Sequence, residues 1–168
     1  MTFKENAKTN LIKAAKEYDK LLKFDYHIKS TKFVHFNEYI LRFNEDNFLH
    51  LTGVETKLKA KIFFNKCLKN DLELDDFVCD SSSELKGKIK EKLKNLLNIG
   101  EFFEVPLIFQ ESFKKNRVEC SLATSDGKCT LGFISVKENV CVPVTLLNKN
   151  QINEKLQITD FIIIAIRK

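Results

Sequence analysis

Apolar residues recur at helical spacing in three stretches of the chain, and each stretch follows the same short polar signature. Thr2, Thr52 and Ser81 each precede a glutamate by three residues. This spacing matches a capping box, in which the hydroxyl and the carboxylate satisfy each other's free backbone donors at a helix start. The apolar positions that follow have the period of an amphipathic helix. We expect helices over residues 3–23, 54–70 and 85–98.

The remaining stretches alternate between apolar and polar residues, which predicts strands. Residues 25–43 are expected to form a hairpin or meander, and Pro106 and Pro143 should lie at a sheet edge or a bulge because proline cannot donate to a ladder. The last strand, Phe161 to Ile166, has no polar face, so we expect it to be central and covered on both sides. From residue 101 onward the expected strands are 102–109, 117–124, 129–137, 140–147 and 157–167, with turns at 126–127 and 138–139.

Helices gathered early and strands gathered late predict an α+β fold, with helices on one face of an antiparallel sheet. The 168 residues suit one domain. Because the sequence contains no repeat, low-complexity tract or Gly/Ser/Pro linker, we expect a single domain over residues 1–168. Residues 1–100 should be its helix-rich part and residues 101–168 its β-rich part.

Charge and composition narrow the class of protein. The net charge is +5, and arginine occurs only at positions 42, 117 and 167, so lysine carries most of the positive charge. Such a balance permits binding to nucleic acid without requiring it. The longest apolar run is far shorter than the ~20 residues of a spanning helix, and the N-terminus lacks the plan of a secretory signal. We therefore expect a soluble protein without membrane association.

Five cysteines, an odd number with no CxxC pair, indicate reduced thiols in an intracellular protein. Together with the three histidines they show no spacing typical of a structural zinc site. No nucleotide-binding loop, nucleophile elbow or zinc-protease motif is present. The sequence thus predicts neither a metal nor a cofactor.

The segment from Asn47 to Val54 is the most informative for chemistry, because it carries His50 just before the expected helix start at Thr52. Near the positive end of a helix dipole an imidazole tends to be neutral and can accept a proton. Free N–H groups around Thr52 and Gly53 would suit a phosphate. A neutral base beside a phosphate is what transesterification of RNA requires. The competing interpretation is that His50 only packs and hydrogen-bonds there.

The stretch from Phe24 to Leu68, and above all Phe43-Asn44-Glu45-Asp46-Asn47-Phe48-Leu49-His50-Leu51-Thr52-Gly53-Val54, resembles a phage-type family of barnase–EndoU–colicin–RelE-like nuclease domains. The resemblance covers about a quarter of the chain well and the rest loosely. It implies a small antiparallel sheet with two helices, metal-independent RNA cleavage, an origin in a phage or mobile element, and work in the bacterial cytosol.

The resemblance places His50 on the family's histidine, and Thr52 and Gly53 on the residues that follow it. We expect His50 as general base or acid, Thr52 and Gly53 as phosphate-binding residues, and Lys57 and Lys61 as cationic help on one helix face. The family usually adds a basic residue and a hydroxyl from the C-terminal sheet. Our predictions for these are Arg117 and Thr145, with Thr130 and Ser135 left open.

Two other functions stay open. The chain could be an inactive scaffold that inhibits a bacterial defence complex, in which case its partner would be a host protein. It could also be a nucleic-acid-binding module, whose affinity would fall steeply with salt. RNA is the expected partner if the chain is an enzyme, and the oligomeric state is undetermined by the sequence.

Overall fold

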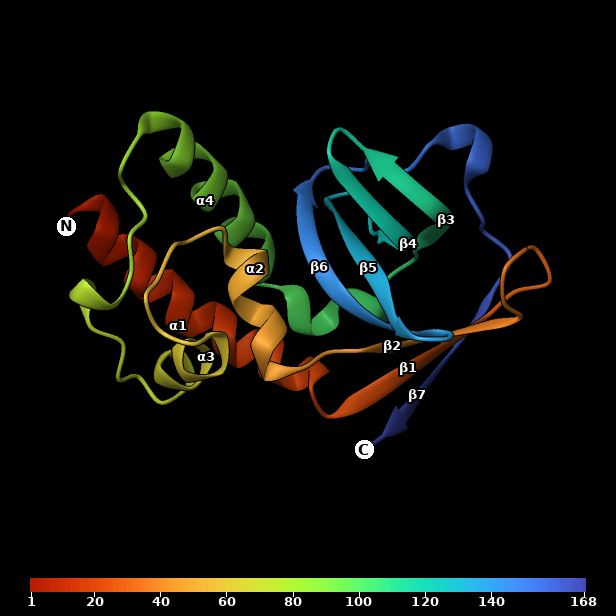
Figure 1. Ribbon diagram of the computed structural model, residues 1–168, viewed down its shortest axis with the longest axis horizontal. Coiled ribbons are helices and arrows are strands. Elements are labelled where there is room, and N and C mark those ends of the chain that lie inside the picture. Colours follow the sequence, from red (N-terminus) through yellow and green to blue (C-terminus); the bar gives the residue numbers. More distant parts are fainter. The chain divides into compact units, whose positions relative to one another are not determined.

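The computed structural model describes all residues, 1–168. Its contacts divide the chain into two compact units (Figure 1). The helical unit comprises Met1–Leu21 and Asn44–Phe102, and the strand unit comprises Leu22–Phe43 and Phe103–Lys168. The early hairpin therefore belongs with the C-terminal strands.

The helical unit contains four α-helices and two short 3-10 helices. A third 3-10 helix, η3 (Ile99–Glu104), begins at its C-terminal end. None of the helices is both long and apolar enough to cross a membrane. The α-helices are α1 (Phe3–Leu21), α2 (Phe48–Thr52), α3 (Ala60–Leu68) and α4 (Ser83–Leu96), and the 3-10 helices are η1 (Glu45–Asn47) and η2 (Leu74–Asp76).

The first and third expected helices are confirmed as α1 and α4. The capping box of α1 is formed: the Glu5 backbone N–H donates to Oγ1 of Thr2 at 3.1 Å, and Oε2 of Glu5 accepts from the Thr2 backbone N–H at 2.8 Å. In α4 the cap is Ser82, one residue later than expected, and it accepts from the Leu85 backbone N–H at 3.1 Å.

The prediction of one helix over residues 54–70, capped by Thr52, is wrong. Thr52 is the last residue of α2, and Gly53 follows in the left-handed conformation with φ of 78°, which is a common way to end a helix. Glu55 then exchanges backbone hydrogen bonds with Val78 instead of completing a capping box. The next helix, α3, begins only at Ala60.

Buried aromatic rings hold the helical unit together. The ring centroid of Tyr18 lies 5.3 Å from that of Phe48 and 5.6 Å from that of Phe64, and all three side chains are fully buried. Each such burial contributes roughly 1.5–3 kcal/mol. The Tyr18 hydroxyl donates to the Asn44 carbonyl at 2.7 Å, so the one polar atom of the cluster is also satisfied.

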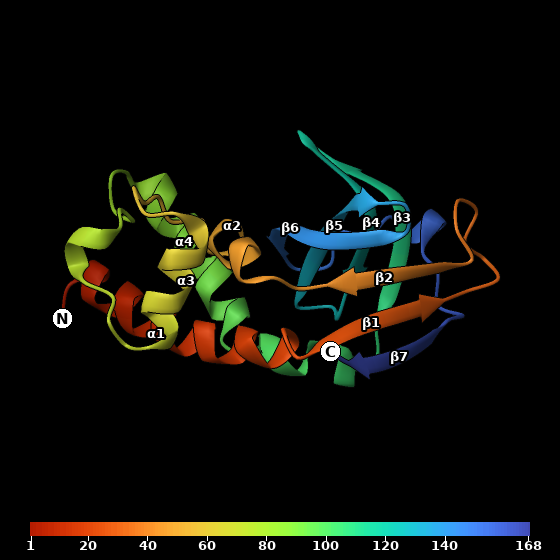
Figure 2. The same cartoon turned by 60° about the horizontal axis from the view of Figure 1, so that its bottom comes forward.

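The strand unit is a seven-stranded sheet in the order β3-β4-β5-β6-β2-β1-β7. All neighbouring strands pair antiparallel except β2 and β6, which pair in parallel. Figure 2 shows β6, β2, β1 and β7 side by side. The strands are β1 (Phe24–Lys29), β2 (Glu38–Arg42), β3 (Ile108–Lys115), β4 (Val118–Ser125), β5 (Cys129–Lys137), β6 (Val140–Asn148) and β7 (Ile162–Arg167).

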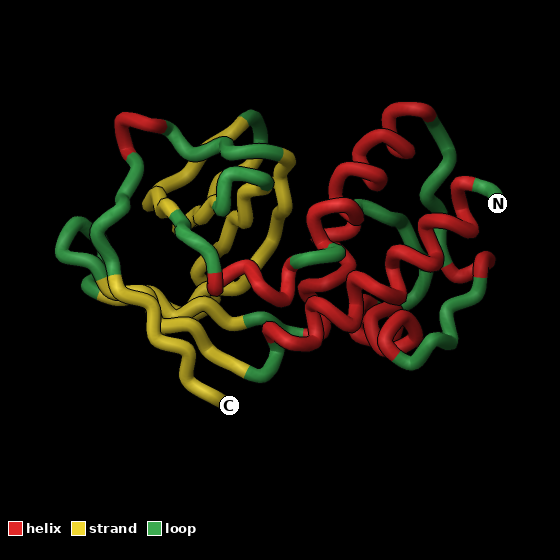
Figure 3. Tube along the Cα trace, turned by 180° about the vertical axis from the view of Figure 1, so that it is seen from behind, coloured by secondary structure: helices red, strands yellow, loops and turns green.

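The sheet of this unit curls, so that strands distant in the sheet order approach one another. Phe109, at the start of β3, exchanges two backbone hydrogen bonds with Ile158, just before β7. Aromatic rings fill the inner side: Tyr26 stacks on Phe103 with centroids 4.0 Å apart, and Phe43 lies 5.7 Å from Phe133. The expected α+β class is confirmed, with helices and strands gathered in different parts of the chain (Figure 3).

Two expectations about the strands are wrong and one is confirmed. Residues 99–104 form the 3-10 helix η3 instead of the start of a strand. The last strand, β7, lies at one end of the sheet order instead of its centre, and Ile162, Ile164 and Ile166 on one of its faces are exposed. An unbroken apolar run thus marked an edge strand here. Pro143 pairs with Phe133 directly beside a register shift in β5, as expected of a proline at a bulge.

Candidate functional site

The helical unit places His50 in the last turn of α2, where its side chain is exposed to solvent. The expected position at the start of a helix is wrong because the helix ends two residues later at Thr52. The dipole argument for a neutral ring therefore does not apply to His50. What remains of the expectation is an accessible imidazole.

Thr52 and Gly53, the residues expected to bind phosphate, lie at the C-terminal end of α2 instead of at a helix start. The Thr52 side chain is fully buried, and its hydroxyl donates to the Leu49 carbonyl at 2.7 Å and accepts from the Val54 backbone N–H at 3.2 Å. Beside Gly53, a Cβ atom would lie 3.0 Å from the Lys92 side chain. The Thr52 hydroxyl and the Val54 backbone N–H thus already have partners within the chain.

Lys57 and Lys61 are both exposed but do not share a helix face. Lys57 precedes α3, whereas Lys61 is the second residue of that helix. The Lys61 ammonium lies 3.9 Å from Oε2 of Glu45. Of these two lysines, therefore, only Lys57 lacks an acidic partner.

The two candidates from the C-terminal sheet, Arg117 and Thr145, lie in the strand unit, so the predicted set is divided between the two units. Arg117 is exposed in the turn between β3 and β4. Thr145 is partly buried on β6 opposite Gly132, and its methyl group would lie 2.7 Å from a Cβ atom at that glycine. Thr145 thus packs against the neighbouring strand.

The strand unit contains a polar cluster that the sequence did not indicate, and its centre is Glu111 on β3. Oε2 of Glu111 accepts from the Tyr39 hydroxyl at 2.5 Å and from the His35 backbone N–H at 3.1 Å. Oε1 accepts from the Val34 backbone N–H at 2.6 Å. One carboxylate therefore fixes the loop between β1 and β2 to β3.

The same loop carries the exposed imidazole of His35, whose Nε2 lies 3.2 Å from Oγ of Ser112. Ser112 interrupts β3 with a φ of 52°, in the left-handed region that costs a non-glycine residue about 1 kcal/mol. Ser112 is left out of the pairing between β3 and β4 although the register does not shift, since Glu111 pairs with Leu122 and Phe113 pairs with Cys120. Residues held in such a backbone conformation cluster at functional sites, and here the Ser112 hydroxyl lies beside the His35 ring.

We call His35, Tyr39, Glu111 and Ser112 the His35 cluster. Burial, and then the hydrogen bond to Glu111, raise the pKa of the Tyr39 hydroxyl well above its usual range, so Tyr39 remains a neutral donor. In the His35 cluster, Tyr39 and Glu111 are 72 residues apart in the sequence, and His35 and Ser112 are 77 residues apart. No spacing rule links such positions, and the positive φ of Ser112 has no sequence signature, which is why the sequence did not reveal this cluster.

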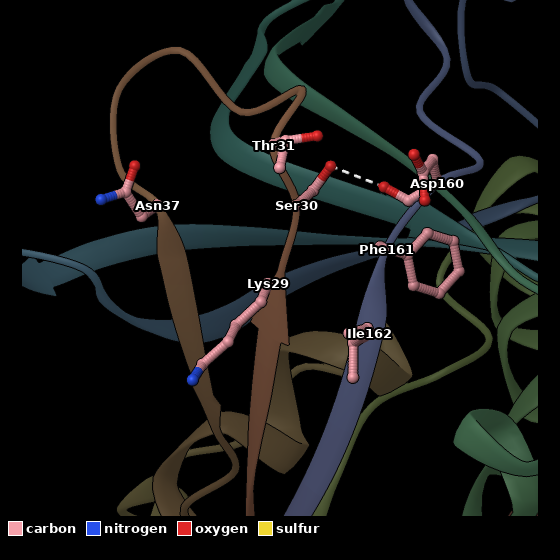
Figure 4. Close-up of a pocket in the computed structure, with 7 residues that line it drawn as sticks. All are labelled: Lys29, Ser30, Thr31, Asn37, Asp160, Phe161 and Ile162. Atoms are coloured by element: carbon pink, nitrogen blue, oxygen red, sulfur yellow. Dashed lines mark hydrogen bonds between the residues drawn. The ribbon is translucent and has the colours of Figure 1, made fainter.

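A hollow of about 290 Å³ opens at the base of the same loop, between the loop ends next to β1 and β2 and the start of β7. Figure 4 shows the Ser30 hydroxyl donating to the Asp160 carbonyl across this end, at 2.6 Å. Lys29, Thr31 and Asn37 also line it, together with Phe161 and Ile162. This hollow at the base of the loop is therefore part polar and part apolar.

Pairs of acidic and basic side chains lie on one face of β1 and β2. His27 Nδ1 pairs with Oε1 of Glu38, whose pKa this hydrogen bond lowers. On the same face the Arg42 guanidinium makes two hydrogen bonds to Asp25, at 3.0 and 2.8 Å. These pairs neutralise each other along neighbouring strands. The partner of the His27 imidazole is thus a carboxylate, whereas that of His35 is the Ser112 hydroxyl.

The thiols offer neither a metal centre nor an activated nucleophile. No three of the His, Cys, Asp and Glu side chains come together in an arrangement that could hold a metal ion. All five cysteines are free and buried. Burial raises the pKa of Cys141 to about 11 and that of Cys120 to about 11 as well, which keeps these thiols protonated at neutral pH.

The strand unit carries most of the net positive charge of the chain. That unit contains thirteen lysines and arginines against nine acidic residues, whereas the helical unit contains fifteen against fourteen. The His35 cluster therefore belongs to the part of the chain that attracts polyanions more strongly.

An α+β chain with an exposed, anchored histidine in a basic unit fits the class of small nuclease-like domains. The model of the family described as phage-Barnase-EndoU-ColicinE5/D-RelE like nuclease4 matches residues 10–168. The match covers nearly the whole sequence, so the chain belongs to this family and the expected resemblance is confirmed. Neither the curated proteins nor the solved structures include a match.

Proposed function

We propose that this chain cleaves RNA by metal-independent transesterification in the bacterial cytosol, and that His35 transfers the proton. The observation that carries the proposal is the geometry of His35: its backbone is fixed by Glu111, and its ring lies within hydrogen-bond reach of Ser112. Membership of a nuclease-like family and the basic strand unit support a nucleic-acid substrate.

In this reaction the 2′-oxygen attacks the adjacent phosphorus and the bond from phosphorus to the 5′-oxygen breaks. A neutral His35 ring would accept the proton of the 2′-hydroxyl, and a protonated ring would return one to the leaving 5′-oxygen. Ser112, beside the same ring, would donate a hydrogen bond to the charged phosphorane. Glu111 already accepts three hydrogen bonds, so its role is to position the loop.

The earlier candidates remain proposals with supporting roles. Arg117 is an exposed cation in the same unit as His35, and Thr145 offers a hydroxyl on β6. His50, Lys57 and Lys61 lie in the helical unit and remain candidates there for contact with RNA. His50 is the alternative proton carrier, because its side chain is also exposed. We prefer His35, because Ser112 lies within hydrogen-bond distance of its ring.

The test is cleavage of a single-stranded RNA in excess EDTA, scored for 2′,3′-cyclic phosphate ends. The three histidines of the chain provide matched variants. We expect His35→Ala to reduce cleavage by roughly 100-fold or more, as for loss of a general acid or base. His27→Ala, which removes a histidine paired with Glu38, should leave the cleavage rate within a few fold.

Each other outcome has a definite meaning. Absence of cleavage by the wild-type chain on any RNA tested would refute the enzymatic proposal. Loss on His50→Ala with full activity of His35→Ala would move the proton transfer to α2. Binding of RNA that falls with salt but never leads to cleavage would favour the binding module, and circular dichroism of each variant controls for folding.

A further inference from the structure

The strand β7 leaves one row of backbone hydrogen-bonding groups unpaired. The Lys168 backbone N–H donates to the Lys23 carbonyl at 2.9 Å, which continues the antiparallel pairing of β7 with β1. Because hydrogen-bonded positions alternate along such a pair, the even-numbered residues of β7 bond to β1. The N–H and C=O groups of Ile163, Ala165 and Arg167 therefore point away from the sheet.

This free edge has none of the features that usually prevent pairing with another strand. Edge strands are commonly protected by proline, a bulge or an inward charge, and β7 pairs with β1 without a register shift over residues 162–167. Its outer face carries three exposed isoleucines, Ile162 at 62%, Ile164 at 45% and Ile166 at 49%. An apolar edge without a bulge or a proline fits another strand.

The sequence of β7 is complementary to itself in one antiparallel register. With Ile164 opposite Ile164 of a second copy, Ile162 faces Ile166 and Ile163 faces Ala165, so side chains of the same face meet. In this register the outward groups of Ile163 and Ala165 form the hydrogen-bonded pairs. The exposed isoleucines of both copies then form one continuous apolar stripe.

Charge also favours this register. Asp160, just before β7, falls opposite Lys168 of the second copy, and it does so at both ends of the pair. The Asp160 side chain is exposed and its carboxylate is unpaired within the chain, while only its carbonyl accepts from Ser30 (Figure 4). The Lys168 ammonium lies 3.9 Å from Asp25 and donates to the Phe43 carbonyl at 3.1 Å, so it would leave these partners to pair with Asp160 of the second copy. A shift of two residues would place Asp160 opposite Ile166 and lose both charge pairs.

We propose that a second copy of this chain binds along the free edge of β7, antiparallel and centred on Ile164, so that the two sheets join into one. The contact combines backbone hydrogen bonds, the isoleucine stripe and two ion pairs. It uses neither the His35 cluster nor α2, so it stands whether or not the chain cleaves RNA.

The register is tested with two cysteine variants. In the proposed pair, Cys at position 164 meets itself with Cα atoms about 4.5 Å apart, within the range of a disulfide. Cys at position 162 would lie about four residues, or ~13 Å, from its counterpart. We expect Ile164→Cys to form a disulfide-linked dimer on mild oxidation and Ile162→Cys to stay unlinked, because the five native cysteines are buried. Equal linking of both variants, or of neither, would refute the register.

The dimer itself is tested by analytical ultracentrifugation across a range of concentrations. The wild type should approach twice 19.5 kDa. Ile164→Lys places two like charges opposite each other at the centre and should weaken association at least tenfold. Val136→Lys changes a side chain of similar exposure, 58%, on β5 and should leave the dimer intact. A wild type that stays monomeric, or an Ile164→Lys variant that dimerises normally, would overturn the proposal.

Discussion

The Tyr39 hydroxyl donates a 2.5 Å hydrogen bond to Oε2 of Glu111, and this bond joins two strands that are not neighbours in the sheet. Tyr39 lies on β2 and Glu111 on β3, with β4, β5 and β6 between them in the sheet order. The bond is therefore evidence of the curl of the sheet. It also sets the position of the loop that carries His35, because the same carboxylate accepts from that loop.

Replacing Tyr39 by phenylalanine tests the energy of this link. A buried hydrogen bond to a charged group contributes about 1.5–3 kcal/mol, so Tyr39→Phe should lower the free energy of unfolding by about that amount in urea titrations. Tyr26→Phe is the matched control, because Tyr26 is also buried but its hydroxyl makes no hydrogen bond within the chain. An equal decrease in the free energy of unfolding of both variants would show that the hydrogen bond from Tyr39 to Glu111 does not stabilise the fold.

Ser112 allows stability and activity to be separated. Its φ of 52° is a conformation that glycine adopts without strain, so Ser112→Gly should raise the free energy of unfolding by about 0.5–1 kcal/mol. The same change removes the hydroxyl beside His35 and should reduce RNA cleavage about tenfold or more. Asn116→Gly, at a φ of 55° in the next turn, should stabilise the chain and leave cleavage unchanged. A Ser112→Gly variant with full activity would exclude the hydroxyl from the reaction.

The fold was largely predictable where local signals act alone. The helix at Phe3–Leu21 and the strand at Cys129–Lys137 appear as expected, because hydrophobic period and turn residues decide them. The errors came where one residue overrides the pattern. Gly53 ends α2 with a positive φ, although Thr52 and Glu55 have the spacing of a capping box.

The position of β7 could not be predicted from its composition, because a strand without a polar face reads the same whether its neighbours lie in the same chain or in another copy. The site was missed for a related reason. His35 and Ser112 meet only through the curl of the sheet, and such a long-range contact leaves no local period. The prediction for His50 rested on a local pattern, the capping-box spacing of Thr52 and Glu55, that indicates a helix start. In the structure a helix ends there, at Thr52.

The ion pair of Asp25 with Arg42 predicts how stability depends on pH. Its hydrogen bonds from Arg42 lower the pKa of Asp25, and burial opposes this shift. Since the unfolded carboxylate then binds protons at a higher pH than the folded one, acidification favours unfolding. The stabilisation should be complete above about pH 4 and be lost as the pH falls through the folded pKa. Asp25→Asn should be less stable than the wild type at pH 7, and the urea midpoints of the two should converge as the pH falls below the folded pKa of Asp25.

A surface pair provides the control for this pH effect. Lys114 and Glu119 lie 3.1 Å apart with side chains 70% and 72% exposed, so water screens their attraction. Glu119→Gln should therefore leave the urea midpoint nearly unchanged, both at pH 7 and at a pH below the folded pKa of Asp25. If Asp25→Asn behaved in the same way, the Asp25–Arg42 pair would have no role in the acid sensitivity of the chain.

Two glycines in different surroundings should respond to alanine with opposite signs. At Gly132 a Cβ atom would lie 2.5 Å from Sγ of Cys120 and 2.7 Å from Cγ2 of Thr145, so Gly132→Ala should lower the free energy of unfolding by about 1–3 kcal/mol. Gly87, inside α4, has nothing within 4 Å, and Gly87→Ala should raise it by about 0.5–1 kcal/mol. Adding Cys120→Ala to Gly132→Ala should recover part of the loss, because the contacts are shared and the two changes are not additive. Strict additivity in urea titrations would mean that β4 and β5 do not approach as closely at Gly132 as the structure places them.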